Sequence, residues 1–200
     1  MTFRLYLITD RTLVPDLPAA VDRALSGIPR GEAAVQLREK DLGGRALLDL
    51  AREVGAACRR RGAPLLVNDR VDVAIVAGAD GVHLAGSSVP VGEARALLGS
   101  RLVGASCHDR AELDRAAGAD FATFGPIFPS RGKPRGIGLE ALGAHRGGLP
   151  LFALGGIDAG NAAAAIGAGA RGVAAIRAWL EGDPAESAAR LFDAVASRIG

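Results

Sequence analysis

The chain is poor in aromatic and sulfur-containing residues. Among its 200 residues there are one Trp, one Tyr, six Phe, one Met and two Cys, and aromatics make up 4% of the sequence. The two cysteines, Cys58 and Cys107, form none of the close spacings typical of zinc or redox sites. This scarcity excludes a disulfide-dense secreted scaffold, so we expect a reduced, cytoplasmic setting.

Strong net charge and long hydrophobic runs are also missing. A formal net charge of +2, with no interleaving of basic and aromatic residues, argues against nucleic acid as a partner. The first apolar run, residues 3–8, is too short for a signal peptide, and no other run is long enough to span a membrane. We therefore expect a soluble protein that binds neither nucleic acid nor membrane.

Short apolar runs alternate with longer helical patterns from end to end, in a chain that is 49% hydrophobic. Eight strands each followed by a helix predict a single-domain (β/α)8 TIM barrel over residues 1–200, rather than an open sheet of five or six strands. The expected strands are Arg4–Ile8, Ala33–Leu37, Leu65–Asn68, Gly81–Leu84, Leu102–Ser106, Phe121–Phe124, Leu151–Leu154 and Gly172–Ile176. The expected helices include Arg45–Arg60, Val71–Ala77, Val91–Leu98, Arg110–Ala117, Leu139–His145, Ala159–Ile166 and Pro184–Ile199.

A weak repeat supports this alternation. The segments at 77–80, 117–120 and 168–171 read Ala-Gly-Ala followed by Asp or Arg, and each stands between a helix and a strand. The glycine is the residue expected in the left-handed position that ends a helix. In a barrel of this kind, functional residues gather in the loops after the strands.

The second strand carries the clearest chemical signal. Gln36, Arg38 and Lys40 are spaced by two, so in an extended chain their side chains project to one side, where an amide and two cations suit a phosphate. Lys40 and Lys133 are the only lysines among 24 basic residues, and both fall in loops that follow strands. The alternative is an ordinary half-exposed strand with charged flanks.

The next three strand ends add polar residues. Asp69 can ligate Mg2+ together with substrate phosphate, or it can cap the helix that follows. His83 reads as a buried barrel histidine, with a catalytic role as the minor alternative. Ser106 can donate to an anion, and His108 is the best general acid–base of the chain by type and position, although either residue can instead cap a helix.

The loop after strand six, residues 125–136, combines three cations with three glycines and three prolines. Such a loop is typical of a flap that closes over a phosphorylated substrate, with an ordinary solvated loop as the alternative. Gly156 after strand seven and Ile176-Arg177 after strand eight occupy the usual phosphate site of the fold. Two anion-binding clusters predict two phosphorylated ligands, or one pyrophosphate and one phosphate.

Together these loops resemble the superfamily of thiamine-phosphate synthases and TenI-like thiazole tautomerases. The similarity covers nearly the whole chain, because seven motifs occur in order. They are YLITD (6–10), VQLREK (35–40), VNDRVDVA (67–74), GVHL (81–84), GASCH (104–108), GPIFPSRGK (125–133) and LGGI (154–157).

The resemblance implies an enzyme that joins hydroxymethylpyrimidine pyrophosphate to a thiazole phosphate, through a pyrimidine carbocation captured by the thiazole nitrogen. By motif, Gln36 would contact the pyrimidine, and Asp69 would hold Mg2+. The pyrophosphate would be held by Arg38, Lys40, Asn68, Ser106 and Lys133, and the thiazole phosphate would face Ser130 and Gly156, with Ile176 and Arg177 beside them. The family habit implies a homo-oligomer.

Three departures from the synthase pattern leave alternatives open. Ser88 stands where a second magnesium aspartate is usual, Arg177 replaces a serine, and the second threonine of an FPTxTK pattern is missing. Loss of one carboxylate should weaken Mg2+ binding by about one to two orders of magnitude. A tautomerase that uses His108 as its acid–base, or a phosphate-binding barrel without catalysis, are the other interpretations.

Overall fold

The computed structural model describes residues 1–145 and 147–197, and it contains a closed barrel of eight parallel strands joined in sequence order. This arrangement confirms the expected (β/α)8 barrel. The strands are β1 Leu5–Ile8, β2 Ala33–Leu37, β3 Leu65–Asn68, β4 Gly81–Leu84, β5 Leu102–Cys107, β6 Phe121–Phe124, β7 Leu151–Leu154 and β8 Gly172–Ala175. Their bounds match the sequence prediction to within one residue, because strands covered on both faces form continuous apolar runs.

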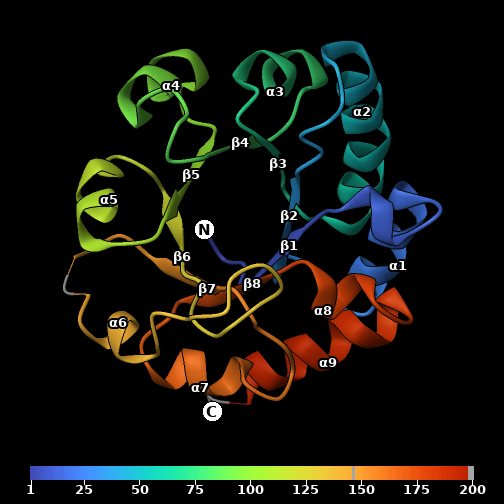
Figure 1. Cartoon of the computed structure of the whole chain (residues 1–200). Coiled ribbons are helices and arrows are strands. Elements are labelled where there is room, and N and C mark those ends of the chain that lie inside the picture. Colours follow the sequence, from blue (N-terminus) through green and yellow to red (C-terminus); the bar gives the residue numbers. More distant parts are fainter. Residues whose placement is uncertain (146, 198–200) are drawn as a thin grey trace.

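The helices form an outer ring around the strands (Figure 1). They are α1 Leu17–Ser26, α2 Gly44–Arg61, α3 Val71–Ala77, α4 Val91–Leu98, α5 Arg110–Arg115, α6 Glu140–Gly143, α7 Ala162–Gly167, α8 Arg177–Leu180 and α9 Pro184–Ala196, with a short 3-10 helix η1 at Arg11–Leu13. None of these helices, within the described residues, has the length and apolar character needed to cross a membrane. The repeated glycines Gly78, Gly118 and Gly169 have φ of 67°, 93° and 106°, as expected for residues that end helices.

Some helix boundaries differ from the sequence prediction. The prediction omitted α1, although Asp16 accepts from the Ala19 N–H as an N-cap and buried residues follow at helical spacing. α7 starts three residues later than expected, because the Asp158 side chain accepts from the N–H groups of Gly160 and Asn161 and holds them in a turn. α5 and α6 are also shorter than expected. The expected end of the last helix, Ile199, lies outside the described residues.

Two apolar clusters make up the core. The larger one lies between the barrel and its helices. The smaller one fills the inside of the barrel and consists of Phe3, Tyr6, Ile8, Ala34, Leu66, Phe121, Phe152 and Ala174. This inner cluster closes the barrel interior, so ligands can enter only at its ends.

Candidate active site

A cavity of about 820 Å³ lies at the carboxyl ends of the strands. It brings together the eleven residues to which the sequence analysis assigned catalysis or substrate binding. These are Gln36, Arg38, Lys40, Asn68, Ser106, His108, Ser130, Lys133, Gly156, Ile176 and Arg177. Residues from six strand ends meet here because parallel strands in a closed barrel all end at the same rim.

The end of β2 supplies the amide and two cations. Gln36 is 2% exposed, Arg38 is half-buried and Lys40 is exposed, so the side chains reach from the cavity floor to its mouth. Gln36 pairs with Ile8 of β1 in the strand register, and its Nε2 lies 3.4 Å from Asn68 Oδ1 on β3. A fixed amide below two cations can orient a polar ring while the cations hold its phosphates.

A buried polar cluster forms the cavity floor. His83 Nε2 lies 3.1 Å from Ser106 Oγ and 3.2 Å from Thr123 Oγ1, which joins β4, β5 and β6. Burial lowers the pKa of His83 to about 3, so its ring is neutral at pH 7. Its Nδ1 has no hydrogen-bond partner within the described part of the chain.

The tautomer protonated at Nε2 leaves no imidazole N–H of His83 buried and unpaired. In that form the ring donates to the hydroxyl oxygens of Ser106 and Thr123. The Ser106 proton then remains available to donate to an anion in the cavity. His83 thus lines the site as a buried neutral histidine. The sequence analysis expected a buried barrel histidine at this position.

Asp69 lies at the rim beside this floor. It has a φ of 58°, a rare backbone conformation for a residue other than glycine and one that occurs most often at functional sites. Its Oδ1 accepts from the Ala85 N–H (2.8 Å), and its Oδ2 accepts from Asn68 Nδ2 (2.9 Å). It does not cap α3, where no side-chain cap is present.

Ser88 is not brought into the cavity. It lies in the turn after β4, where its N–H donates to the Ala85 carbonyl, and neither Ser88 nor Asp69 is among the residues that line the cavity. Among the residues that the structure describes, no cluster of three or more His, Cys, Asp or Glu side chains is arranged to hold a metal ion. Of the two positions expected to hold magnesium, Asp69 carries a carboxylate and Ser88 does not.

The loop between β6 and α6 lies over the β7 end of the cavity. The N–H of Phe128 donates to the Gly155 carbonyl (3.0 Å), and Ser130 and Lys133 exchange two backbone hydrogen bonds of 2.8 Å. Gly156 has a φ of 63°, and a Cβ added there would lie 2.5 Å from the Pro129 carbonyl oxygen. The loop and the Gly155-Gly156 turn are therefore packed closely enough to require glycine.

Arg177 lies on the opposite side of this turn, at the start of α8. Its Nη1 lies 2.7 Å from Glu181 Oε1, and both residues line the cavity. The positive charge of Arg177 is thus shared with the carboxylate of Glu181. An incoming phosphate would compete with Glu181 for the same guanidinium group.

His108 lies at the edge of the cavity and is exposed. Its Nδ1 and its backbone N–H both approach Glu112 Oε2, at 2.9 and 2.6 Å. Asp109, and neither Ser106 nor His108, caps α5 by accepting from the Glu112 N–H. Glu112 therefore orients the His108 ring at the rim of the cavity.

The sequence analysis missed several residues that line the cavity. They are Asp10, Cys107, Thr123, Asp158 and Glu181. Asp10 comes two residues after β1, so its position after a strand was a usable signal, whereas Glu181 caps the end of α8, a helix that the sequence analysis did not expect. Burial raises the pKa of Cys107 to about 12, so its thiol remains protonated and is a poor nucleophile.

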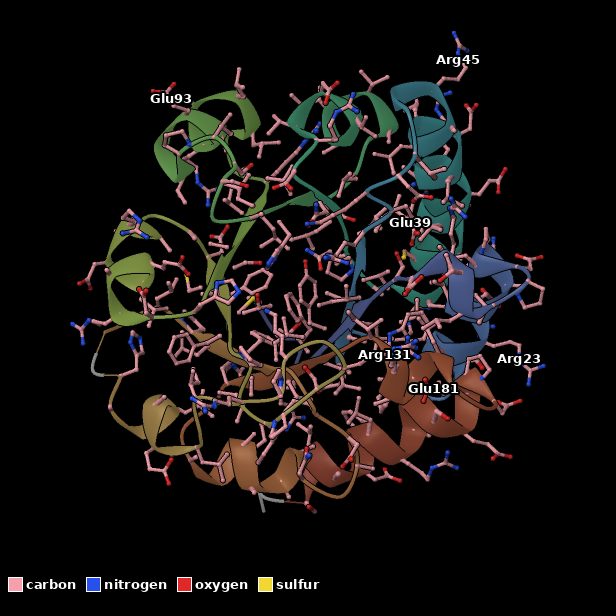
Figure 2. All side chains as sticks on the ribbon, in the orientation of Figure 1. Arg23, Glu39, Arg45, Glu93, Arg131 and Glu181 are labelled. Carbon is pink, nitrogen blue, oxygen red and sulfur yellow. The ribbon has the colours of Figure 1, made fainter. Side chains whose placement is uncertain are left out.

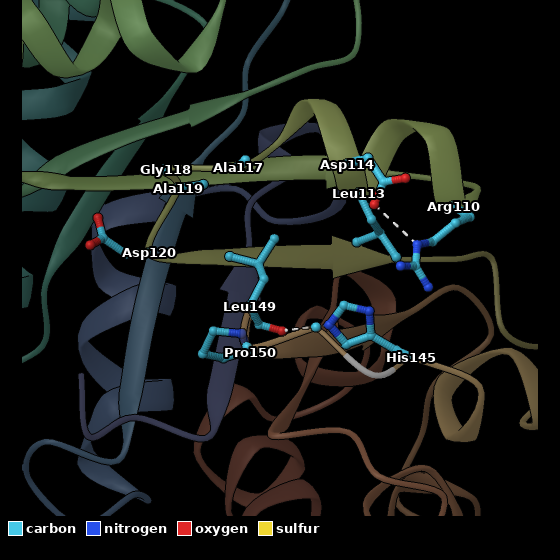
Figure 3. A pocket seen from close by; sticks show the side chains of 12 residues that line it. Arg110, Leu113, Asp114, Ala117, Gly118, Ala119, Asp120, His145, Leu149 and Pro150 are labelled. Carbon is cyan, nitrogen blue, oxygen red and sulfur yellow. Dashed lines mark hydrogen bonds and ion pairs between the residues drawn. The ribbon is translucent and has the colours of Figure 1, made fainter.

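A second, more open pocket lies between α5 and the segment that leads into β7 (Figure 3). Its polar side chains pair locally, since Arg110 bonds Asp114 and His145 Nε2 lies 3.1 Å from the Leu149 carbonyl oxygen. This pocket lies away from the strand ends that carry the cations. It contributes no group to the site described above.

Comparison with known proteins agrees with this geometry. A family profile described as thiamine monophosphate synthase matches residues 5–179. A putative thiamine-phosphate synthase of Geobacter sulfurreducens is 50% identical over 95% of the chain and 93% of that protein. A thiamine-phosphate synthase of Chloroflexus aurantiacus is 41% identical over 98% of the chain and 93% of that protein.

A solved structure shows the same relation. The thiamine phosphate pyrophosphorylase of Pyrococcus furiosus superposes with a TM-score of 0.90 at 32% identity, covering 100% of this chain and 98% of the other. Sequence and fold thus agree over almost the full length, and the relatives that carry these names are transferases. The chain belongs to the thiamine monophosphate synthase family of (β/α)8-barrel enzymes.

Proposed function

We propose that the protein joins hydroxymethylpyrimidine pyrophosphate to a thiazole phosphate, forming thiamine phosphate and releasing pyrophosphate. The observation that carries this proposal is the presence of two separated groups of anion-binding residues in one cavity. One group follows β2, β3 and β5, and the other follows β7 and β8. The loop after β6 contributes Lys133 to the first group and Ser130 to the second. The family relation, over almost the whole chain, supports the same substrates.

We assign binding of the pyrophosphate to the first group of residues. Arg38, Lys40 and Lys133 supply positive charge, while Asn68 and Ser106 supply uncharged hydrogen-bond donors. Lys133 comes from the β6–α6 loop, so it reaches the cavity from the side opposite Lys40. Gln36, buried on the floor and held by Asn68, fits the polar edge of the pyrimidine ring.

We assign binding of the thiazole phosphate to the second group of residues. Gly156 and Ser130 present backbone and hydroxyl donors where the loop after β6 crosses the β7 turn. Ile176 offers an apolar contact for the ring, and Arg177 offers a charge for the phosphate. With this assignment, the thiazole nitrogen and the pyrimidine methylene carbon would have to meet toward the centre of the cavity.

The reaction requires that the departing pyrophosphate anion be stabilised. It does not require a strong base. The bond between the methylene carbon and the pyrophosphate oxygen breaks, and the electron pair leaves with pyrophosphate. The cationic carbon then accepts the thiazole nitrogen lone pair, which forms the new C–N bond. Arg38, Lys40 and Lys133 stabilise the negative charge that develops on the leaving group, which is the main task of this site.

Asp69 fits a magnesium site with one protein carboxylate. Each of its oxygens accepts one hydrogen bond from the protein, which leaves further lone pairs for a cation. Mg2+ commonly takes one or two carboxylates and completes its shell with substrate phosphates and water. When bound, the ion would neutralise charge on the departing pyrophosphate.

A direct assay tests the proposal. The protein is incubated with both substrates, with and without Mg2+, and pyrophosphate release and thiamine phosphate are measured. We expect release that depends on both substrates and on Mg2+, and a drop in kcat/KM of about 100-fold or more for Lys133→Ala. Absence of pyrophosphate release at every Mg2+ concentration would refute the proposal.

A second candidate activity is isomerisation of a thiazole carboxylate phosphate by His108. The observation in its favour is the contact of the His108 ring with Glu112 at the cavity edge. If the protein is a tautomerase, His108→Ala abolishes isomerisation. If it is the synthase, His108→Ala leaves most pyrophosphate release intact, since the proposed reaction needs no general base there.

A further inference from the structure

Glu39 is a buried carboxylate between the two cations of the β2 end. Its side chain is only 3% exposed, whereas Arg38 and Lys40 on either side line the cavity. Figure 2 shows Arg23, Arg45 and Glu93 pointing outward from the ring of helices, with Glu39 inside that ring. Successive side chains of an extended chain point to opposite faces, so Glu39 points away from the cavity when its neighbours point into it.

Three groups near the end of β1 hold Glu39. The Thr9 hydroxyl donates to Glu39 Oε1 at 2.6 Å, and the Arg11 N–H lies 3.2 Å from each carboxylate oxygen. Arg11 Nε lies 3.9 Å from Oε2, and the Arg11 guanidinium also pairs with Asp41. Burial raises the pKa of Glu39 despite these partners, so the carboxylate is retained at a cost to stability.

Thr9 continues the hydrogen bonding between the β1 and β2 segments beyond the last residue pair of the two strands. The Thr9 N–H donates to the Gln36 carbonyl at 2.9 Å, and the Thr9 hydroxyl oxygen then accepts the Arg38 N–H at 2.9 Å. A continuous chain of hydrogen bonds therefore runs from the Arg38 backbone through the Thr9 hydroxyl to Glu39. Thr9 is completely buried, so water cannot replace it.

We propose that Thr9 and Glu39 are positioning residues that fix the segment after β2, so that Arg38 and Lys40 are presented together to the pyrophosphate. β2 itself ends at Leu37. Without the contacts of Thr9 and Glu39, which we call the lock, the next three residues would have no hydrogen bond to the segment that follows β1. Preorganised cations bind an anion more tightly than mobile ones, because less conformational entropy is lost on binding. This inference rests on the proposed function for the identity of the anion.

The test uses Thr9→Val, which keeps the shape of the side chain and removes both hydrogen bonds. Titration calorimetry with inorganic pyrophosphate in Mg2+ buffer should give a Kd about tenfold or more above that of the unaltered protein. The KM for thiazole phosphate should stay within about twofold, because the residues assigned to that ligand lie after β6, β7 and β8. Thr9→Ser, which retains the hydroxyl, should restore most of the pyrophosphate affinity.

Thr2→Val is the matched control, since the Thr2 hydroxyl donates to the Gly31 carbonyl at the opposite end of the same pair of segments. It should leave the Kd for pyrophosphate unchanged. If Thr9→Val does not fold, Glu39→Ala is measured in the same way. An unchanged Kd in a folded lock variant, or equal losses for both ligands, would overturn the inference.

The two proposals fail in different ways. If the protein binds pyrophosphate and the lock variants weaken that binding, but no thiamine phosphate forms, the lock stands and the synthase assignment falls. If thiamine phosphate forms and Thr9→Val affects neither the Kd nor the KM for the pyrimidine substrate, the lock falls and the synthase stands.

Discussion

At the scale of single residues, His83 shows how burial determines chemistry. It is 1% exposed and packs against Gly104, where an added Cβ would lie 2.5 Å from its Nδ1. The pKa of about 3 means that the folded protein does not protonate this ring until the medium is strongly acidic. The residue therefore serves as a fixed neutral donor to Ser106 and Thr123.

This pKa shift predicts a pH dependence of stability. In the unfolded chain His83 takes up a proton near pH 6.5, so between pH 6.5 and about 3 the unfolded state binds more protons than the folded state. The free energy of unfolding should fall as pH decreases through this window, by up to about 1.4 kcal/mol per pH unit. Urea denaturation at pH 7, 6, 5 and 4 measures this slope.

A variant isolates the contribution of His83. His83→Gln should lower stability at pH 7 and reduce the slope below pH 6.5, because Gln does not titrate. Equal slopes in the variant and in the unaltered protein would show that other groups control the acid response.

At the scale of elements, the β6–α6 loop and the β7–α7 turn depend on each other. Gly156 combines a left-handed backbone with a close approach to Phe128 and Pro129. A side chain there would push the loop away from the cavity, and with it Ser130 and Lys133. The turn at Gly155-Gly156 and the β6–α6 loop thus form one structural unit.

Gly156→Ala tests this dependence. We expect both KM values to rise several-fold, because the loop that carries Ser130 and Lys133 is displaced. Gly78→Ala is the matched control, because Gly78 has a similar φ of 67° but nothing lies within 4 Å of the added Cβ. Both variants should lose about 1–2 kcal/mol of stability from backbone strain, and only Gly156→Ala should alter the KM.

Element boundaries were predictable where a local signal was strong and isolated. β3, α3 and β4 were predicted with their observed bounds, since a capping glycine and apolar runs delimit them. α1 carries a cap and periodic apolar residues, yet two prolines at its start obscured it. α8 is only four residues long, and its single turn depends on the burial of Trp179 and Leu180, which is a tertiary effect.

At the scale of the whole molecule, stability depends on a small aromatic cluster inside the barrel. Phe121 is fully buried, and its ring centroid lies 5.5 Å from Phe3, 5.1 Å from Tyr6 and 5.3 Å from Phe152. Four of the few aromatic residues are thus concentrated at one place. The Trp179 indole N–H, within 3.1 Å of the carbonyl oxygens of Ile8 and Ala175, ties α8 to the closure between β1 and β8.

Phe121→Ala should therefore lower the free energy of unfolding by about 3–5 kcal/mol, because the barrel interior cannot collapse around the cavity that it leaves. Urea denaturation measures the loss. Phe192→Ala is the control, since Phe192 lies partly buried on α9 outside the barrel and should cost clearly less. A loss from Phe121→Ala no larger than that from Phe192→Ala would contradict this account.

The pattern of apolar runs along the sequence predicts the barrel, and it predicts that the strand-end residues of the candidate site share one rim. Apolar runs define the strands, and the loop after each strand in a parallel barrel must lie at one rim, so Arg38, Lys133 and Arg177 were predicted to converge. That inference needs only the order of elements, because a closed parallel barrel leaves the loops no other location.

Tertiary structure alone decided the contacts between those loops. The sequence does not show that Ser88 lies outside the cavity lining, that Glu181 pairs with Arg177, or that Glu39 is held by Thr9 from the segment after β1. Each of these depends on the distance between segments that are remote along the chain, or on a backbone turn that neighbouring strands impose. Local pattern and spacing carry no information about such distances, so only the folded barrel determines them.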